Sequence, residues 1–125
     1  MAEESKSLEL PFTTRVLGQE GALRLRDQKI TQTIRSQKEA YKFFRKRGTY
    51  VRVTLDGEYL YDARITEVHR KALKYLDQFD AEICGFDYLE DLNHALKRAG
   101  YRFVSLADYQ RTYAIEFLPK REEAS

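Results

Sequence analysis

The 125-residue chain contains one cysteine, two prolines and no tryptophan. A single cysteine, Cys84, excludes an intramolecular disulfide, and its neighbours Ile83 and Gly85 favour a small buried side chain. His69 and His94 stand far apart and no Cys/His cluster has zinc spacing, so we expect no metal site and no cofactor. No stretch approaches the roughly 20 apolar residues of a membrane span, so we expect no membrane association. The first residues lack a signal-peptide core, which predicts a cytoplasmic protein.

The composition is that of a globular domain, because 42% of the residues are hydrophobic and 34% are charged. We expect one domain over residues 8–119, with disordered tails at 1–7 and 120–125. The net charge of +2 conceals an asymmetry, since residues 15–52 hold eleven Lys or Arg against three Asp or Glu, whereas 53–125 hold ten against fourteen. A basic segment suggests an anionic partner; a solvated basic face balanced by acidic helices is the equal alternative. The oligomeric state does not follow from the sequence.

Alternation of apolar residues and turn signals predict the order of the elements. We expect strands at 7–12, 30–35, 49–55, 58–68 and 111–118, a helix at 38–47, a turn with a short helix at 71–85, and a longer helix at 87–100. Residues 18–28 fit either a helix or a turn. This order predicts an α+β fold, a small mixed β-barrel with helices packed outside, because closure removes exposed sheet edges.

Capping residues mark the helix ends. Ser36 and Glu39 form a capping-box pattern, and Gly48 is expected to end that helix. Asp87 is expected to cap the longer helix and Gly100 to stop it. The apolar stripe of that helix comprises Leu89, Leu92, Leu96 and Ala99. Asp56-Gly57 is a strong two-residue hairpin turn.

The stretch KITQTIR carries an unusual polar row. On a strand, one face would hold Lys29, Thr31, Thr33 and Arg35, and the other Ile30, Gln32 and Ile34. An arginine fork binds a phosphate or a base edge bidentately, and threonine hydroxyls hydrogen-bond phosphate, ribose or base. The alternative is structural, because Thr is favoured in strands and Arg35 can pair with a carboxylate such as Asp62 or Glu67.

Four segments in order resemble the ASCH domain, a family of the PUA-like β-barrels: ITQTIR, GTYVRVTLDGEYLYDARITEV, ICGFDYLEDL and YAIEFLP. The match covers roughly residues 8–119. The resemblance implies a PUA-like barrel with a basic cleft that accepts RNA or a nucleotide-like ligand. It places Thr31, Thr33 and Arg35 on the strand that lines the cleft, beside Lys29. Further phosphate contacts would come from Arg45, Lys46, Arg47 and Arg52.

A hydrolase is the alternative function. Some ASCH-like proteins resemble an amidohydrolase that removes acetyl from acetylcytidine with a Lys, a Thr and a Glu. Thr33 falls on the threonine position, whereas Ile30 holds the lysine position next to Lys29, and Glu82 lies near the glutamate position. The catalytic candidates are therefore Lys29, Thr33 and Glu82, an incomplete set.

The sequence leaves two other functions as alternatives. A ribonuclease would need a general base and a cation, for which His69, Lys29 and Arg35 are available. A protein-interaction domain would use the FFRKRG segment, residues 43–48. We therefore expect an RNA- or nucleotide-binding module and keep the hydrolase as the alternative.

Overall fold

The computed structural model of the chain describes residues 8–101 and 111–120. Its elements are β1 (Glu9–Phe12), α1 (Thr14–Arg26), β2 (Gln32–Ser36), α2 (Gln37–Ala40), η2 (Tyr41–Phe43), β3 (Tyr50–Leu55), β4 (Glu58–Arg70), η3 (Leu73–Tyr75), α3 (Gln78–Ile83), α4 (Leu89–Arg98) and β5 (Thr112–Pro119). The expected tails at 1–7 and 120–125 lie outside the described residues, except for Lys120. None of the helices in the described ranges is long and apolar enough to cross a membrane.

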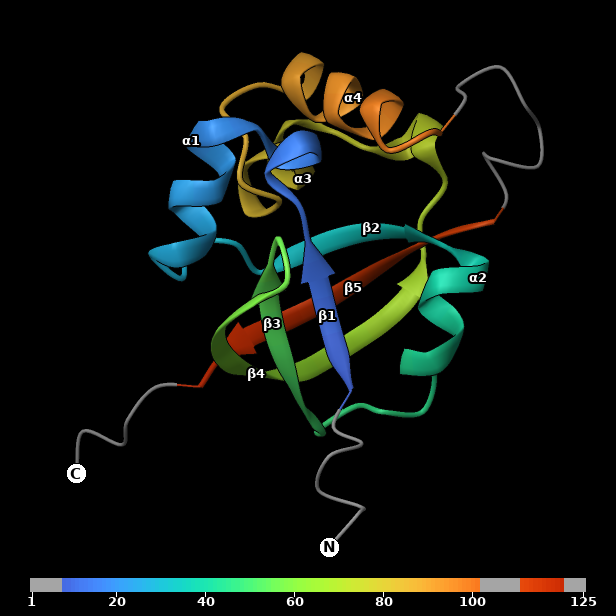
Figure 1. Cartoon of the computed structure of the whole chain (residues 1–125). Helices are drawn as coiled ribbons and strands as arrows, with labels where there is room; N and C mark the ends of the chain where they lie inside the picture. The colour runs from blue at the N-terminus through green and yellow to red at the C-terminus, as the bar shows by residue number, and fades with distance from the viewer. Residues whose placement is uncertain (1–7, 102–110, 121–125) are drawn as a thin grey trace, which may run out of the picture.

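The five strands of the described chain form one mixed sheet in the order β1-β3-β4-β5-β2. β1 runs parallel to β3, and all the other neighbours are antiparallel. The sheet curls into a half-barrel, with α1, α3 and α4 gathered at one end (Figure 1). The expected fold class, an α+β fold with a small mixed barrel and peripheral helices, is confirmed.

The concave face of the sheet carries the core. Its fully buried side chains include Leu10, Val51, Val53, Leu55, Ala63, Ile65, Ile115 and Phe117. Phe12 of β1 and Phe117 of β5 lie with ring centroids 6.2 Å apart, although their strands are not neighbours in the sheet. Because this contact spans the barrel interior, the curl of the sheet is fixed by packing as well as by hydrogen bonds.

The hairpin of β3 and β4 matches its sequence pattern. Asp56 and Gly57 have φ values of 52° and 86°, the left-handed pair that a tight hairpin turn needs. β4 runs on to Arg70, because after an irregularity between Ile65 and Glu67 it continues to pair with β5.

The prediction of a helix over residues 38–47 is wrong in its length, because the helical segment is shorter. Ser36 caps it as predicted, accepting from the Glu39 backbone N–H at 3.2 Å, but α2 ends at Ala40 and η2 at Phe43. The backbone then turns extended at Phe44, whose ring packs 5.0 Å from that of Tyr113. This aromatic contact with β5 takes the chain away from the helix axis before Gly48.

Two other helix ends also differ from expectation. Residues 14–26 form α1, with a kink at Gly18, where φ is 81°. The N-cap of α4 is Tyr88 rather than Asp87, and the Leu89 backbone N–H donates to the Gln78 side chain at 3.0 Å. Asp87 instead accepts from Arg24 at 2.9 Å, so a tertiary ion pair replaces the expected cap.

Candidate ligand pocket

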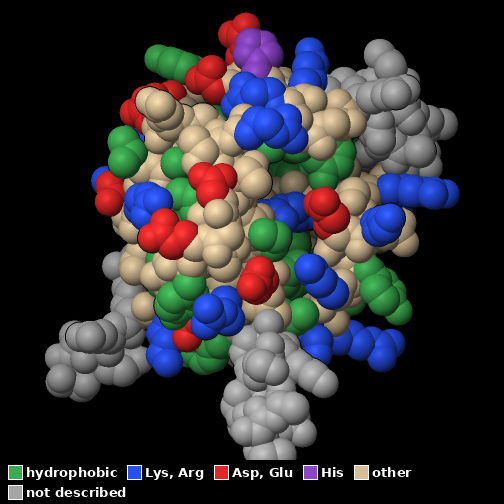
Figure 2. All heavy atoms as spheres, in the orientation of Figure 1, with side chains coloured by type: hydrophobic (Ala, Val, Ile, Leu, Met, Phe, Trp, Pro, Cys, Tyr) green, Lys and Arg blue, Asp and Glu red, His purple; other side chains and the backbone are tan. Residues whose placement is uncertain are grey.

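A pocket of about 300 Å³ opens between the two edge strands of the half-barrel and the helices above them. Figure 2 shows it as a hollow on this face, with a basic side chain visible inside. Its lining comprises Pro11, Phe12, Thr13, Arg15, Val16, Leu17, Gln32, Thr33, Ile34, Arg35, Glu39, Cys84, Phe86, Leu92, Ala95, Leu96, Ala99 and Tyr101. Most of the wall is therefore apolar, with a few polar groups in fixed places, as in many small-ligand sites.

Arg35 of β2 is the central polar group of the pocket. Its Nε donates to the Thr33 hydroxyl at 3.0 Å, and its Nη2 donates to the Pro11 carbonyl oxygen on β1. The guanidinium carbon also lies 5.0 Å from the centre of the Phe12 ring. Arg35 thus bridges β2 and β1, which are the two unpaired edges of the sheet. Within the described residues, Nη1 has no protein acceptor.

The electrostatics of the pocket centre on the same residue. Burial lowers the pKa of Arg35, and the charge of Glu39 partly opposes this; a guanidinium remains protonated at neutral pH all the same. Burial, together with Glu39, raises the pKa of Tyr101, which lines the same pocket. The pocket therefore presents a half-buried cation, with a carboxylate and a neutral phenol near it.

A polar network lies behind the pocket. Gln32 donates through its amide to Asp80 at 3.1 Å and to the Cys84 sulfur at 3.5 Å. Lys71 lies 3.3 Å from the Asp80 carboxylate. Burial by itself would raise the pKa of Asp80, but hydrogen bonds from Gln32 and the Asp77 backbone, with the charge of Lys71, lower it. This network holds α3 against β2 and keeps the back wall in place.

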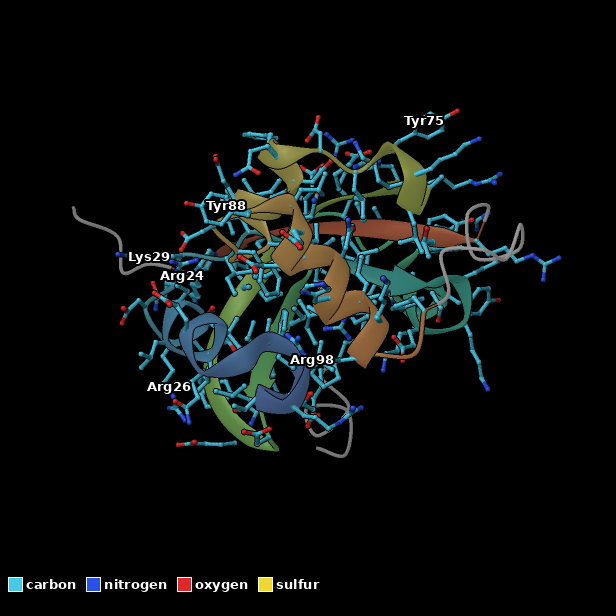
Figure 3. All side chains as sticks on the ribbon, turned by 90° about the horizontal axis from the view of Figure 1, so that it is seen from above. Arg24, Arg26, Lys29, Tyr75, Tyr88 and Arg98 are labelled. Carbon is cyan, nitrogen blue, oxygen red and sulfur yellow. The ribbon has the colours of Figure 1, made fainter. Side chains whose placement is uncertain are left out.

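Arginines on α1 and α4 connect these two helices beside the pocket. Arg98 of α4 donates to the Val16 carbonyl oxygen at 2.6 Å, and Arg15 of α1 donates to the Arg98 carbonyl oxygen at 3.0 Å. Figure 3 shows Arg98 against the ribbon of α1. The first turn of α1 also contacts the β3–β4 turn, because the Thr14 backbone N–H donates to the Asp56 carboxylate at 2.9 Å. The kinked segment of α1 is therefore fixed at both sides.

Of the polar row expected at 29–35, the structure brings Thr33 and Arg35 into the pocket lining. Lys29 and Thr31 are not in it. β2 begins only at Gln32, and the Lys29 backbone N–H still belongs to the turn after α1, donating to Arg24 at 2.9 Å. Figure 3 shows Lys29 at the edge of the molecule beside Arg24. The expected alternation does not separate two faces of β2 either, because Gln32 and Ile34 line the pocket together with Thr33 and Arg35.

The other expected phosphate-binding residues lie elsewhere. Arg45, Lys46 and Arg47 are exposed in the loop between η2 and β3, and Arg47 lies 3.7 Å from Glu67. Arg52 is exposed on β3, with its guanidinium 4.1 Å from the centre of the Tyr59 ring. None of these residues lines the pocket. The basic segment of the sequence is thus divided between two regions of the molecule.

The catalytic candidates are likewise separated. Thr33 lines the pocket, whereas Lys29 and Glu82 do not. Glu82 is exposed on α3 and accepts from Gln78 at 3.1 Å. His69, considered for a ribonuclease, lies 2.9 Å from Glu116 and is also outside the lining.

Sequence reasoning missed several lining residues, including Glu39, Phe86 and Tyr101. Leu92 and Leu96 were expected on the apolar stripe of α4, but helical periodicity does not tell a core-facing stripe from a cavity-facing one. The sequence pattern indicated Glu39 only as a helix-capping residue.

Comparisons with known proteins bear on the fold. No protein-family model matches the chain, and no curated protein matches it. The chain is similar to the crystal structure of the DUF984 protein EF3133 from Enterococcus faecalis V583, with a TM-score of 0.58 and 21% identity over 94% of this chain and 84% of that one. It also aligns with the solution structure of protein PF0455 from Pyrococcus furiosus, with a TM-score of 0.45 and 15% identity over 90% of this chain and 97% of that one. The first likeness supports the fold alone.

Proposed function

We propose that the chain is a nucleotide- or RNA-binding module of the ASCH type, and that its pocket receives one nucleotide with Arg35 as the anchor. The observation that carries the proposal is the state of the Arg35 side chain. Thr33 and Pro11 hold one edge of the guanidinium, while Nη1 meets no protein acceptor in the described residues. A guanidinium with free N–H groups recognises a phosphate or the acceptor edge of a base.

The shape and lining of the pocket suit such a ligand. A volume of about 300 Å³ is at the small end of ligand sites, which fits a single nucleotide and excludes a duplex. Phe12, Phe86 and Leu92 offer apolar surface for a base or a ribose. The Thr33 hydroxyl lies beside Arg35 as a further hydrogen-bonding group.

Hydrolysis has less support than binding. Of the three catalytic candidates only Thr33 lines the pocket, and a threonine nucleophile needs a base within hydrogen-bond reach. Glu39 is the carboxylate of the lining, but its influence on Arg35 acts through charge, without an ion pair within 4 Å. We therefore propose binding and leave turnover as the alternative.

The test is a titration of the full chain with the four ribonucleoside monophosphates, followed by calorimetry. We expect Arg35→Ala to weaken the binding of the preferred nucleotide by about 1–3 kcal/mol, which is about 5- to 150-fold. Arg26→Ala is the matched control, because Arg26 is an exposed arginine of α1 that pairs with Glu58 and does not line the pocket. Thermal unfolding of each variant checks that the fold is intact, since Arg35 also bridges β1 and β2.

Two outcomes would overturn the proposal. One is that no nucleotide binds at millimolar concentration. The other is that Arg35→Ala and Arg26→Ala weaken binding equally, because the loss would then reflect net charge rather than a contact in the pocket.

A further inference from the structure

A second polar surface lies on the convex side of the sheet, away from the pocket. In the register of the sheet, Tyr50 of β3 pairs with Arg64 of β4, and Arg52 pairs with Asp62. The Lys120 backbone N–H donates to the Asp62 carbonyl oxygen at 2.7 Å, which places Lys120 next in that row. Paired residues of antiparallel strands share a face, and this face is opposite to buried Val51, Val53 and Ala63. We call Tyr50, Arg52, Tyr59, Arg64 and Lys120 the outer basic face.

Two exposed tyrosines carry the cations of this face. Tyr50 is 48% exposed and Tyr59 is 44% exposed. The Arg52 guanidinium lies 4.1 Å from the centre of the Tyr59 ring, and the Lys120 ammonium lies 5.2 Å from that of Tyr50. The rings therefore hold the charges at the surface, and neither ring is covered by the core.

The cations of the face lack acidic partners. Among the described residues, neither Arg52, Arg64 nor Lys120 forms an ion pair within 4 Å, although carboxylates lie in the same row. Glu9 pairs with Arg52 in the register, and Asp62 accepts from the Tyr59 hydroxyl at 3.0 Å instead. The guanidinium and ammonium groups thus remain available to anions.

A basic loop extends this surface. Residues 45–47, the Arg-Lys-Arg of the FFRKRG segment, precede Gly48, whose N–H donates to the Ile65 carbonyl oxygen at 2.7 Å beside Arg64. Loop and face together hold six Lys or Arg against Glu9, Asp62 and Glu67, a surplus of three positive charges. The whole chain has a net charge of +2, so its positive surplus is concentrated here. Figure 1 shows this loop at the end of the barrel away from α1 and α4.

We propose that the outer basic face binds single-stranded nucleic acid, with phosphates on Arg52, Arg64 and Lys120 and bases stacked on Tyr50 and Tyr59, on the ring faces that the cations do not cover. Cations and exposed aromatic rings are the two components with which proteins hold single strands without reading sequence. Tyr59 pairs with Thr54, four residues along β3 from Tyr50, so the two backbone positions are roughly 13 Å apart along the strand. A duplex keeps its bases stacked internally and has no use for the rings. The face shares no residue with the pocket, so this inference goes beyond the nucleotide site.

The first test is the binding of a fluorescently labelled 12-nucleotide oligouridylate, measured by anisotropy at several salt concentrations. We expect the triple variant R52A/R64A/K120A to bind at least tenfold more weakly. Because a single strand releases about 0.7 counterion per phosphate neutralised, the slope of log affinity against log salt should fall by about two. Y50L/Y59L should weaken binding with the slope unchanged, since stacking releases no counterions.

The matched control is K29A/K42A/K74A, which removes the same charge from exposed lysines outside the face. It should weaken oligonucleotide binding by less than threefold. Equal losses in the control and the triple variant would overturn the inference, as would oligonucleotide affinity that the triple variant leaves unchanged. Binding of a protein in place of the oligonucleotide would also overturn it.

The same variants separate this inference from the proposed function. Loss of oligonucleotide binding in Arg35→Ala alone would mean that the strand enters the pocket, which refutes the outer basic face and retains the nucleotide site. Oligonucleotide binding that depends on Arg52, Arg64 and Lys120, in a protein that binds no mononucleotide, would refute the pocket proposal and retain this one.

Discussion

Gly85 offers a stability test of how closely the loop before α4 packs on the entry to β2. Its φ is +98°, a conformation that residues with a side chain rarely adopt. A Cβ at this position would lie 2.6 Å from Cδ1 and 2.8 Å from Cγ1 of Ile30. Ile30 is fully buried, so its side chain has little room to move. Gly85→Ala therefore meets two penalties, one in the backbone and one in packing.

The backbone penalty and the packing penalty can be estimated and measured separately. Left-handed backbone costs an L-residue about 1–2 kcal/mol, and overpacking a filled core costs about 1–3 kcal/mol. We expect Gly85→Ala to lower the free energy of unfolding by about 2–5 kcal/mol. This is a large share of the total free energy of unfolding of a typical domain, which is about 5–15 kcal/mol. Gly48→Ala separates the two terms, because Gly48 has a φ of +87° but a Cβ there would meet no atom within 4 Å. That variant should lose only the backbone term.

The assay is urea unfolding of the two alanine variants, followed by a double-mutant cycle with Ile30→Val. The valine removes Cδ1 and by itself should cost about 0.5–1.5 kcal/mol. In the Gly85→Ala background it also relieves part of the clash, so we expect the double variant to be more stable than additivity predicts by about 1 kcal/mol. The reasoning is refuted if Gly85→Ala costs no more than Gly48→Ala, or if the cycle is additive.

Two further predictions concern the wall behind the pocket. The pKa of Asp80 is held below its ordinary value, so its contribution to stability is present above about pH 4 and disappears as the pH falls through the folded pKa. Asp80→Asn should therefore be destabilised at pH 7 and approach the wild type in acid; an equal deficit in urea unfolding at about pH 3 would contradict this. Burial raises the pKa of Cys84 to about 12, so we expect the native thiol to resist a disulfide reagent and to react fully in denaturant. Rapid reaction in the native protein would show that this wall opens.

Local chemistry explains which elements were predictable. Asp56-Gly57 was predictable as a hairpin turn, because the turn needs left-handed backbone at both residues and Asp-Gly is a favoured pair for it. Ser36 caps α2 for the same kind of local reason. The end of that helix was not predictable, since Phe44 leaves the helix axis to contact Tyr113, which is far away in the sequence.

The pocket was predictable only in part. Strand alternation indicated Thr33 and Arg35, which do line it, but it assigned Gln32 and Ile34 to the opposite face, and they line the pocket as well. The pattern had no means of showing that Lys29 belongs to the turn after α1. Nor did it indicate Tyr101, which comes to the pocket from the far end of α4.

The sequence by itself determined the hairpin, the capped start of α2 and the apolar stripe of α4, because each depends on residues within a few positions of one another. The order of the elements along the chain then predicted the class of fold. Only the tertiary structure decided where the basic residues go. Arg35 lies in the pocket because β1 and β2 meet across the open edge of the barrel. Arg52 lies on the outer basic face because its β3 position faces away from the core. The charge of a segment counts residues that are neighbours along the chain, whereas recognition depends on residues that are neighbours in space. The curl of the sheet places basic residues that are close in the sequence on different surfaces.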